Sequence, residues 1–115
     1  MSQVVHVESE LDYHSALQEA NNKLVVVDLF AEWCPPCNTM AAIFDALSIQ
    51  YPEVVFIKVN VDQVVSLKPF ALPTFNFYRC NHKVGTIIGA NEQLLRRGLE
   101  NNGQVSLCSS VCMIQ

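Results

Sequence analysis

Basic residues are scarce in this sequence, and it shows neither an export signal nor a membrane span. The 115 residues include seven Lys and Arg against eleven Asp and Glu, a formal net charge of −4. With no Lys/Arg cluster, this balance argues against a nucleic-acid-binding surface. The N-terminus lacks the charged and long apolar regions of a secretory signal, and the longest apolar run, near Val25, is far too short to cross a bilayer. We therefore expect a cytoplasmic location.

Composition predicts one folded domain with a short tail. Hydrophobic residues make up 50% of the chain and charged residues only 16%, which excludes disorder across its body. The length suits a single core, and we place the domain at residues 1–102 and a flexible tail at 103–115. Five cysteines without a signal peptide fit a reducing compartment, where thiols are more often catalytic than structural.

Strands and helices are predicted to alternate and then to end in a hairpin and a helix. Strands are expected at residues 4–7, 24–30 and 54–61, and hairpin strands at 74–79 and 83–88 around a turn of Cys80, Asn81 and His82. The run at 24–30 is apolar on both faces, as in a parallel strand covered by helices. This order predicts an α/β fold.

Four helical segments accompany these strands. Ser9 is expected to cap a helix at residues 10–20, with Leu11, Ala16, Leu17 and Ala20 facing inward. A long helix is expected at 34–51, with Met40, Ile43, Phe44 and Leu47 at helical spacing. One or two helical turns are expected at 63–68, and Asn91 should cap a last helix that ends near residue 101.

Two cysteines separated by two prolines follow the apolar strand directly. Cys34 lies where the long helix begins, and helix N-terminal amides and the helix dipole stabilise an anion, so its thiol pKa should be lowered. Cys37 lies one helical turn away, within reach of a disulfide, and Pro35 and Pro36 suit the first turn. The pattern predicts a redox-active dithiol. The alternatives are two core cysteines, or a zinc or iron–sulfur site, for which the sequence offers no second ligand pair.

The stretch VDLFAEWCPPC at residues 27–37 resembles the active-site segment of thioredoxins. Residues 56–62, 72–75, 84–85 and 89–91 also match, so the resemblance covers about residues 4–101. It implies the thioredoxin fold, a central mixed sheet of about five strands flanked by about four helices. It also implies a monomeric protein-disulfide reductase in which Cys34 attacks a target disulfide and Cys37 releases the product. No bound cofactor is implied, since electrons would come from NADPH through thioredoxin reductase.

The resemblance also assigns roles to residues around the dithiol. Asp28 would be the buried acid beneath Cys37 that accepts its proton, with Lys58 as its neighbour, and burial should raise the pKa of Asp28. The alternative is that Asp28 only forms a salt bridge with Lys58. Trp33 should shield the dithiol and offer an apolar face to a polypeptide, or else serve as a core aromatic that anchors the surface.

Substrate contacts are expected from residues on both sides of the cysteines. Pro35 and Pro36 belong to this group with Trp33. Pro73 matches the cis-proline that faces the cysteines in this family, although an isolated X–Pro bond is usually trans, and Leu72 before it would bond an extended substrate. Gly89 either lines the groove or permits a tight strand end.

Two departures from the family pattern affect partner choice and redox potential. Pro35 replaces the usual glycine and removes an amide donor near Cys34. The segment between Asp62 and Pro73 is about one helical turn shorter than usual, so the third helix should be shortened. A docking module with weak turnover is therefore a competing interpretation, and a specialised oxidoreductase like tryparedoxin or nucleoredoxin is another.

The tail contains a second motif. Its last four residues, Cys-Met-Ile-Gln at 112–115, match the C-a-a-X prenylation box, and Cys108 would be a second lipid site. Two lipids give stable anchoring, which would hold the protein at the cytoplasmic face of a membrane. The alternatives are a chance match, or an auxiliary dithiol formed by Cys108 and Cys112.

Overall fold

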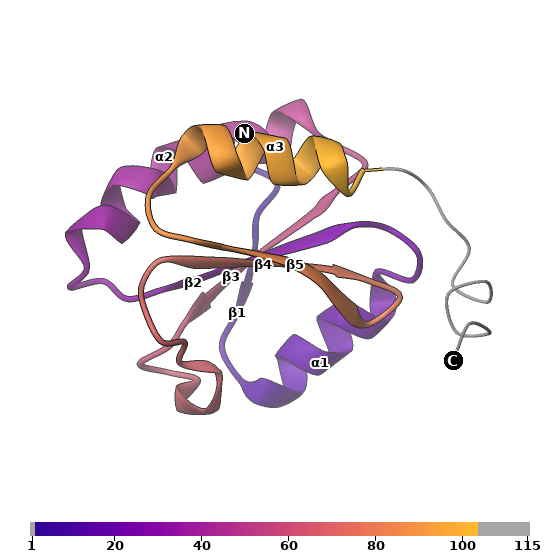
Figure 1. The fold of residues 1–115 in the computed structure, drawn as a ribbon. Coiled ribbons are helices and arrows are strands. Elements are labelled where there is room, and N and C mark those ends of the chain that lie inside the picture. The colour runs from indigo at the N-terminus through magenta and orange to yellow at the C-terminus, as the bar shows by residue number, and fades with distance from the viewer. Residues whose placement is uncertain (1, 104–115) are drawn as a thin grey trace.

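The strands form one mixed sheet in the order β1-β3-β2-β4-β5 (Figure 1). The computed structural model describes residues 2–103. Its strands are β1 (Val5–Val7), β2 (Val25–Phe30), β3 (Val55–Asn60), β4 (Thr74–Arg79) and β5 (His82–Ile88). β2 lies in the centre, parallel to β3 and antiparallel to β4, so the five-stranded mixed sheet that was predicted is confirmed.

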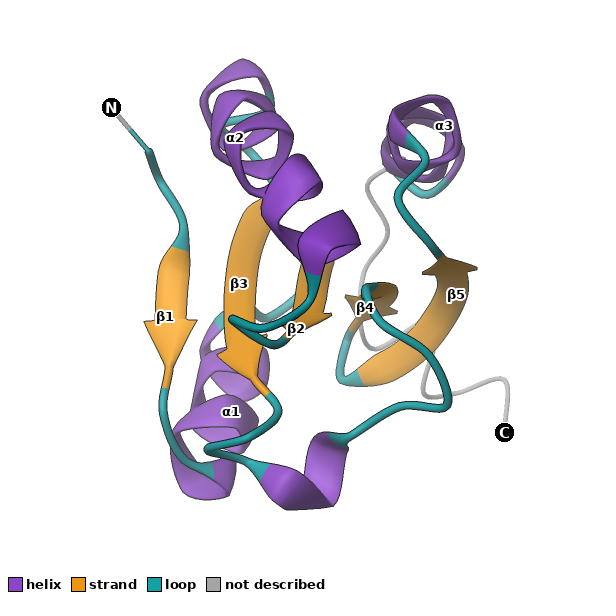
Figure 2. Cartoon of the chain, turned by 90° about the vertical axis from the view of Figure 1, so that its left-hand side faces the viewer, coloured by secondary structure: helices purple, strands orange, loops and turns teal. Residues whose placement is uncertain are grey.

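Helices cover both faces of this sheet. These are α1 (Glu10–Glu19), α2 (Pro35–Gln50) and α3 (Glu92–Asn101). Figures 1 and 2 show α1 on one face and α2 with α3 on the other. The predicted caps of α1 and α3 are confirmed: Ser9 Oγ accepts from the Asp12 amide at 3.1 Å, and Asn91 Oδ1 accepts from the Leu94 amide at 3.0 Å. A cap satisfies an amide that the helix itself leaves unpaired.

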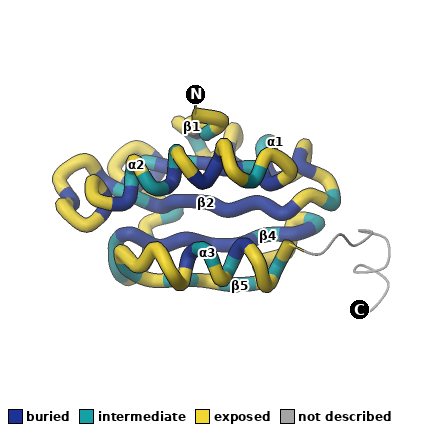
Figure 3. Tube along the Cα trace, turned by 90° about the horizontal axis from the view of Figure 1, so that it is seen from above, coloured by how far each residue is buried: buried dark blue, intermediate teal, exposed yellow. Residues whose placement is uncertain are grey.

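The alternation of side chains along β2 supplies two buried clusters, one beneath each helical layer. Val25, Val27 and Leu29 pack with Ile57 and Val59 on the α1 side. Val26 packs on the other side with residues of α2, β3, α3 and the hairpin, namely Met40, Phe44, Leu47, Phe56, Phe75, Phe77, Leu95 and Leu99. β2 is buried along nearly its whole length (Figure 3), which explains why its sequence is almost continuously apolar.

Helix α1 turns a different stripe toward the core from the one predicted. Leu17 and Ala20 are buried as expected, but Leu11 is 76% exposed and Tyr13 is buried instead. At about 100° per residue, Leu11 lies on the side of the helix opposite Tyr13. The Tyr13 hydroxyl donates to the Tyr78 hydroxyl at 2.9 Å, so the polar end of this buried ring is satisfied.

The segments on either side of β4 also differ from expectation. The hairpin turn consists of Cys80 and Asn81 alone, with φ of 54° and 68°, and His82 already belongs to β5. Two successive positive φ values suit the twist of a two-residue hairpin. The predicted third helix is a single turn of 3-10 helix, η1 (Val65–Leu67), so three α-helices flank the sheet in the described part of the chain rather than about four.

Candidate active site

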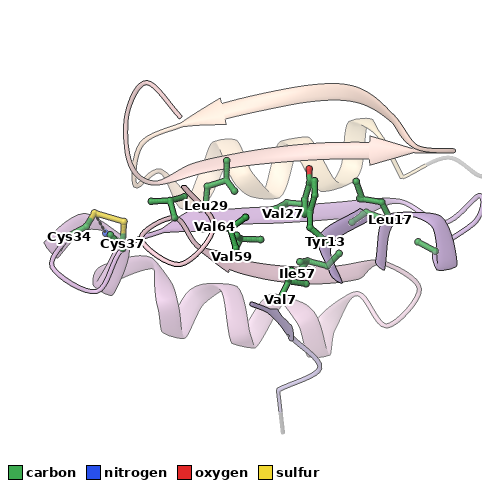
Figure 4. Close-up of a cluster of buried hydrophobic side chains, with 14 residues drawn as sticks. Val7, Tyr13, Leu17, Val27, Leu29, Cys34, Cys37, Ile57, Val59 and Val64 are labelled. Carbon is green, nitrogen blue, oxygen red and sulfur yellow. Dashed lines mark hydrogen bonds between the residues drawn. A yellow bond between two sulfur atoms is a disulfide. The ribbon is translucent and has the colours of Figure 1, made fainter. Parts of the chain in front are cut away.

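Cys34 and Cys37 form a disulfide where β2 passes into α2. Their Cα atoms are 5.3 Å apart, and both side chains are buried. Figure 4 shows the disulfide at one end of the buried cluster on the α1 side of the sheet. Cys34 is the N-cap of α2, with the two prolines in the first turn. The central strand and the long helix therefore fix the position of both sulfur atoms.

The two prolines limit the number of backbone amides that can donate hydrogen bonds to Cys34. Because Pro35 and Pro36 have no N–H, the amide of Cys37 is the first one available at the start of α2. It donates to Cys34 Sγ at 3.2 Å, and the Asn38 amide bonds the Cys34 carbonyl at 3.1 Å. One backbone donor and the helix dipole are thus placed to stabilise a thiolate on Cys34 once the disulfide is reduced.

Asp28 is the buried carboxylate of β2, and it lies on the sheet face that α2 covers. Its side chain is 1% exposed, and its Oδ1 has no hydrogen-bond partner among the described residues. Asp28 is two residues from Val26 on β2, so both side chains leave the same face of the sheet. Its register partner on β4 is Phe75, and its surroundings are therefore largely apolar. The pKa of Asp28 is raised to about 7, mainly because burial disfavours the charged carboxylate; Lys58 lowers the pKa and Asp45 of α2 raises it by smaller amounts.

Lys58 is the neighbour of Asp28 that the resemblance implies. The two residues are register partners on β3 and β2, so their side chains leave the same face of the sheet. The Lys58 amino group lies 4.3 Å from the centre of the Phe30 ring. Asp28 and Lys58 do not form an ion pair within 4.0 Å. The simple salt bridge is therefore not what the structure contains, and Asp28 is left protonatable near neutral pH.

The peptide bond between Leu72 and Pro73 is cis, as the resemblance implies. The Pro73 carbonyl accepts from the Gly89 amide at 2.9 Å, which ties the strand end of β5 to the start of β4. Gly89 has φ of 101°, a value that favours glycine, so the tight strand end accounts for this residue. Gly89 does not line the cleft at Cys34.

A cleft with a volume of about 320 Å³ adjoins the dithiol. It brings together four predicted site residues, Trp33, Pro35, Pro36 and Leu72, around Cys34. Trp33 is 64% exposed and therefore not a core aromatic. Its Nε1 donates to Asp62 Oδ2 at 2.8 Å, which holds the indole beside the cysteines. Lys58 and Pro73 lie outside the lining of this cleft, as Gly89 does.

Sequence reasoning missed the other wall of the cleft, which consists of Lys68, Pro69, Phe70 and Ala71. None of these residues was predicted to contribute to the site. Asp62, which orients Trp33, was also missed. The shortened segment before Pro73 was the one available signal, since any change in that segment alters the residues that approach Cys34.

No cluster of three or more His, Cys, Asp and Glu side chains that could hold a metal occurs within residues 2–103. Over the same residues, no helix has the length and apolar character needed to span a bilayer. The lipidation predictions for Cys108 and Cys112 fall on residues 104–115, outside the described part of the chain, and so does the auxiliary dithiol of these two cysteines.

The arrangement is suited to thiol–disulfide exchange. It combines a reversible disulfide at a helix N-terminus, a buried acid with a pKa near 7 on the face of the sheet that carries the same helix, and an apolar cleft open to a polypeptide.

Comparison with known sequences identifies the family. The thioredoxin family model matches residues 3–101. The chain is 40% identical over 105 residues to thioredoxin of Ictalurus punctatus, covering 86% of this chain and 98% of the relative. It is 38% identical over 96 residues to human thioredoxin, covering 80% and 91%.

Solved structures give the same result. Fasciola hepatica thioredoxin superposes with a TM-score of 0.80 at 36% identity, covering 85% of this chain and 98% of that one. Thioredoxin NaTrxh of Nicotiana alata gives a TM-score of 0.82 at 28% identity, covering 90% and 95%. Members of this family are thiol-disulfide oxidoreductases that act through a redox-active disulfide and need no bound cofactor. With its Cys34–Cys37 pair at the end of β2, the chain belongs to the thioredoxin family and is a protein-disulfide reductase.

Proposed function

We propose that the chain passes electrons from NADPH, through a thioredoxin reductase, to disulfides in target proteins. One observation carries the proposal: Cys34, which forms a disulfide with Cys37 at the start of α2, lines an apolar cleft that a polypeptide can enter. The reductase would convert this disulfide into the two thiols, and a target disulfide would convert it back. A cytoplasmic location is part of the proposal, because a free dithiol persists only in a reducing compartment.

In the first step, the Cys34 thiolate attacks one sulfur of the target disulfide. The target S–S bond breaks, a bond forms between Cys34 Sγ and the attacked sulfur, and the other target sulfur leaves as a thiolate. The Cys37 amide and the dipole of α2 favour the thiolate that begins this step.

In the second step, Cys37 attacks Cys34 and releases the target with two reduced sulfurs. Cys37 must lose its proton before it attacks, and Asp28 is our candidate acceptor. A carboxylate with a pKa of about 7 can take up a proton and return it at neutral pH. The two electrons that reduce the target leave the chain with the Cys34–Cys37 disulfide restored.

The test is NADPH-driven reduction of insulin by the native chain and by Cys34→Ser, in the presence of thioredoxin reductase. We expect turnover by the native chain and none by the variant. Activity with dithiothreitol but not with the reductase would retain the dithiol chemistry and reject the proposed electron donor. Absence of turnover with both reductants would favour the docking module instead.

A further inference from the structure

The connection between β3 and β4 leaves one large aromatic side chain without any cover. Val64 is buried, and Leu67 and Leu72 are partly buried against the cluster on the α1 side of the sheet. Phe70 lies between these anchors and is fully exposed, with a relative exposure of 103%. An apolar side chain of this size gains nothing from folding when it stays in water.

The backbone around Phe70 is nevertheless held in place. The Lys68 amide donates to the Val65 carbonyl at 3.1 Å, and Thr74 Oγ1 donates to the Ala71 carbonyl at 2.6 Å. Pro69 further restricts the chain between these two bonds. Phe70 is therefore presented on a segment fixed at both ends, which lowers the entropy lost when a partner covers the ring.

Phe70 also differs from the other exposed apolar residues by its place beside the reacting sulfur. Single apolar residues such as Leu11 and Ile49 are common on protein surfaces and need no explanation. Phe70 lines the same cleft as Cys34 and Trp33. A polypeptide that occupies this cleft while its disulfide reacts with Cys34 can therefore contact the Phe70 ring.

We propose that Phe70 is a specificity-determining residue, and that the cleft selects polypeptides with a large apolar side chain within a residue or two of the disulfide. The inference rests on the proposed reductase function and names the class of target. The lining supports an apolar occupant, since apart from Cys34 and the charged Lys68 it consists of Trp33, Pro35, Pro36, Pro69, Phe70, Ala71 and Leu72. Burial of part of the Phe70 ring against the target would supply the selectivity.

The test uses the pre-reduced full chain in single turnover with two peptide disulfides that differ only beside the reactive cysteine, where one has Leu and the other has Ser. Trp33 is the one tryptophan of the sequence and lies beside the dithiol, so its fluorescence can follow the reaction. Ile49→Ala is the matched control for Phe70→Ala. Ile49 is 48% exposed near the far end of α2, about 20 Å from the cysteines at 1.5 Å per residue.

We expect the native chain to react about tenfold faster with the Leu peptide than with the Ser peptide. This ratio corresponds to a difference of about 1.4 kcal/mol in activation free energy. Phe70→Ala should lose this preference by slowing the Leu peptide alone, while Ile49→Ala should behave like the native chain. Hydroxyethyl disulfide, which is too small to span the cleft, should react equally with all three proteins.

The inference is overturned if the native chain shows no preference, if Phe70→Ala slows both peptides equally, or if Ile49→Ala has the same effect as Phe70→Ala. A concentration-dependent dimer that Phe70→Ala abolishes would also overturn it, because a second copy would then be the occupant. Failure of the pre-reduced native chain with both peptides and with hydroxyethyl disulfide would instead reject the reductase function on which the inference rests.

Discussion

The two walls of the Cys34 cleft are built in opposite ways. The wall that contains Trp33 continues into the long helix α2, whose Phe44 is fully buried beneath the sheet's central strands. The wall that contains Phe70 belongs to a connection with a single 3-10 turn and an uncovered aromatic ring. The first wall fixes the reacting sulfurs through the core. The second can change without loss of the core, so we expect it to determine which partners bind.

Matched substitutions of two phenylalanines give the largest contrast between these walls. Phe44→Ala should lower the free energy of unfolding by about 3–5 kcal/mol, because it removes a buried ring that packs edge-on against Phe56 at 5.1 Å between ring centroids. Phe70→Ala should change the free energy of unfolding by less than about 0.5 kcal/mol. Urea unfolding of both variants measures the difference, and similar losses would show that the Phe70 wall belongs to the core.

The pH dependence of stability tests the buried acid on the α2 side. The pKa of Asp28 rises from 3.8 to about 7 on folding, so between these values the folded chain keeps a proton that the unfolded chain releases. Its contribution to stability is complete below about pH 4 and is lost as the pH rises through about 7. Because asparagine does not ionise, Asp28→Asn should not lose stability in this pH range. The variant should therefore be more stable than the native chain at alkaline pH by up to about 4 kcal/mol.

Urea unfolding over a range of pH checks this difference. The stability difference between Asp28→Asn and the native chain should shrink as the pH falls toward about 4, and Glu53→Gln, an exposed substitution of another acidic residue, is the matched control. A constant difference between Asp28→Asn and the native chain at every pH would mean that folding does not raise the pKa of Asp28.

The same substitution should slow the second chemical step. A positioned proton acceptor contributes about 100-fold or more to rate, so Asp28→Asn should accumulate the mixed disulfide with a target peptide while its first step stays near the native rate. Acid quenching followed by intact mass measures both steps. Lys58→Met should shift the native pH profile of resolution upward, because Lys58 lowers the pKa of Asp28. Equal resolution rates in the native and Asp28→Asn proteins would remove Asp28 from the mechanism.

The smallest expected effect concerns the proline at the start of α2. Pro35→Gly restores an amide donor beside Cys34 and should stabilise the thiolate by about 0.5 kcal/mol. The pKa of the Cys34 thiol should fall, and the reduction potential should become slightly less negative, by roughly 10 mV. Equilibration with glutathione measures the potential. A shift toward more negative values would show that chain flexibility outweighs the added donor.

The central strand and the helix caps around the site were predictable from sequence, because the local residue pattern there indicates the same structure that burial in the core requires. The valine run predicted β2, and Ser9 and Asn91 were recognisable as helix caps from residue type and spacing. The burial of Asp28 followed from its place in an apolar strand. The inward side of α1 was not predictable, since the partner of the Tyr13 hydroxyl is Tyr78, 65 residues away in the chain.

The Phe70 wall was not predictable for a different reason. Between residues 62 and 73 the sequence predicts only a short helical stretch at 63–68, so the path of the residues after it depends on where Leu67 and Leu72 contact the core. The family resemblance placed Pro73 but gave no position for Phe70, because this segment is shorter than in the family. The sequence could therefore indicate that partner choice would differ, but not which side chain would approach Cys34.

The order of attack by the two cysteines is the central claim, and trapping tests it most directly. Cys37→Ser should capture a peptide disulfide as a stable adduct, and tryptic mapping should place the adduct on Cys34. Cys34→Ser should form no adduct at Cys37, which is one turn inside α2. If Cys34→Ser forms the adduct at Cys37 and Cys37→Ser forms none, the assignment of nucleophile and resolving cysteine is contradicted.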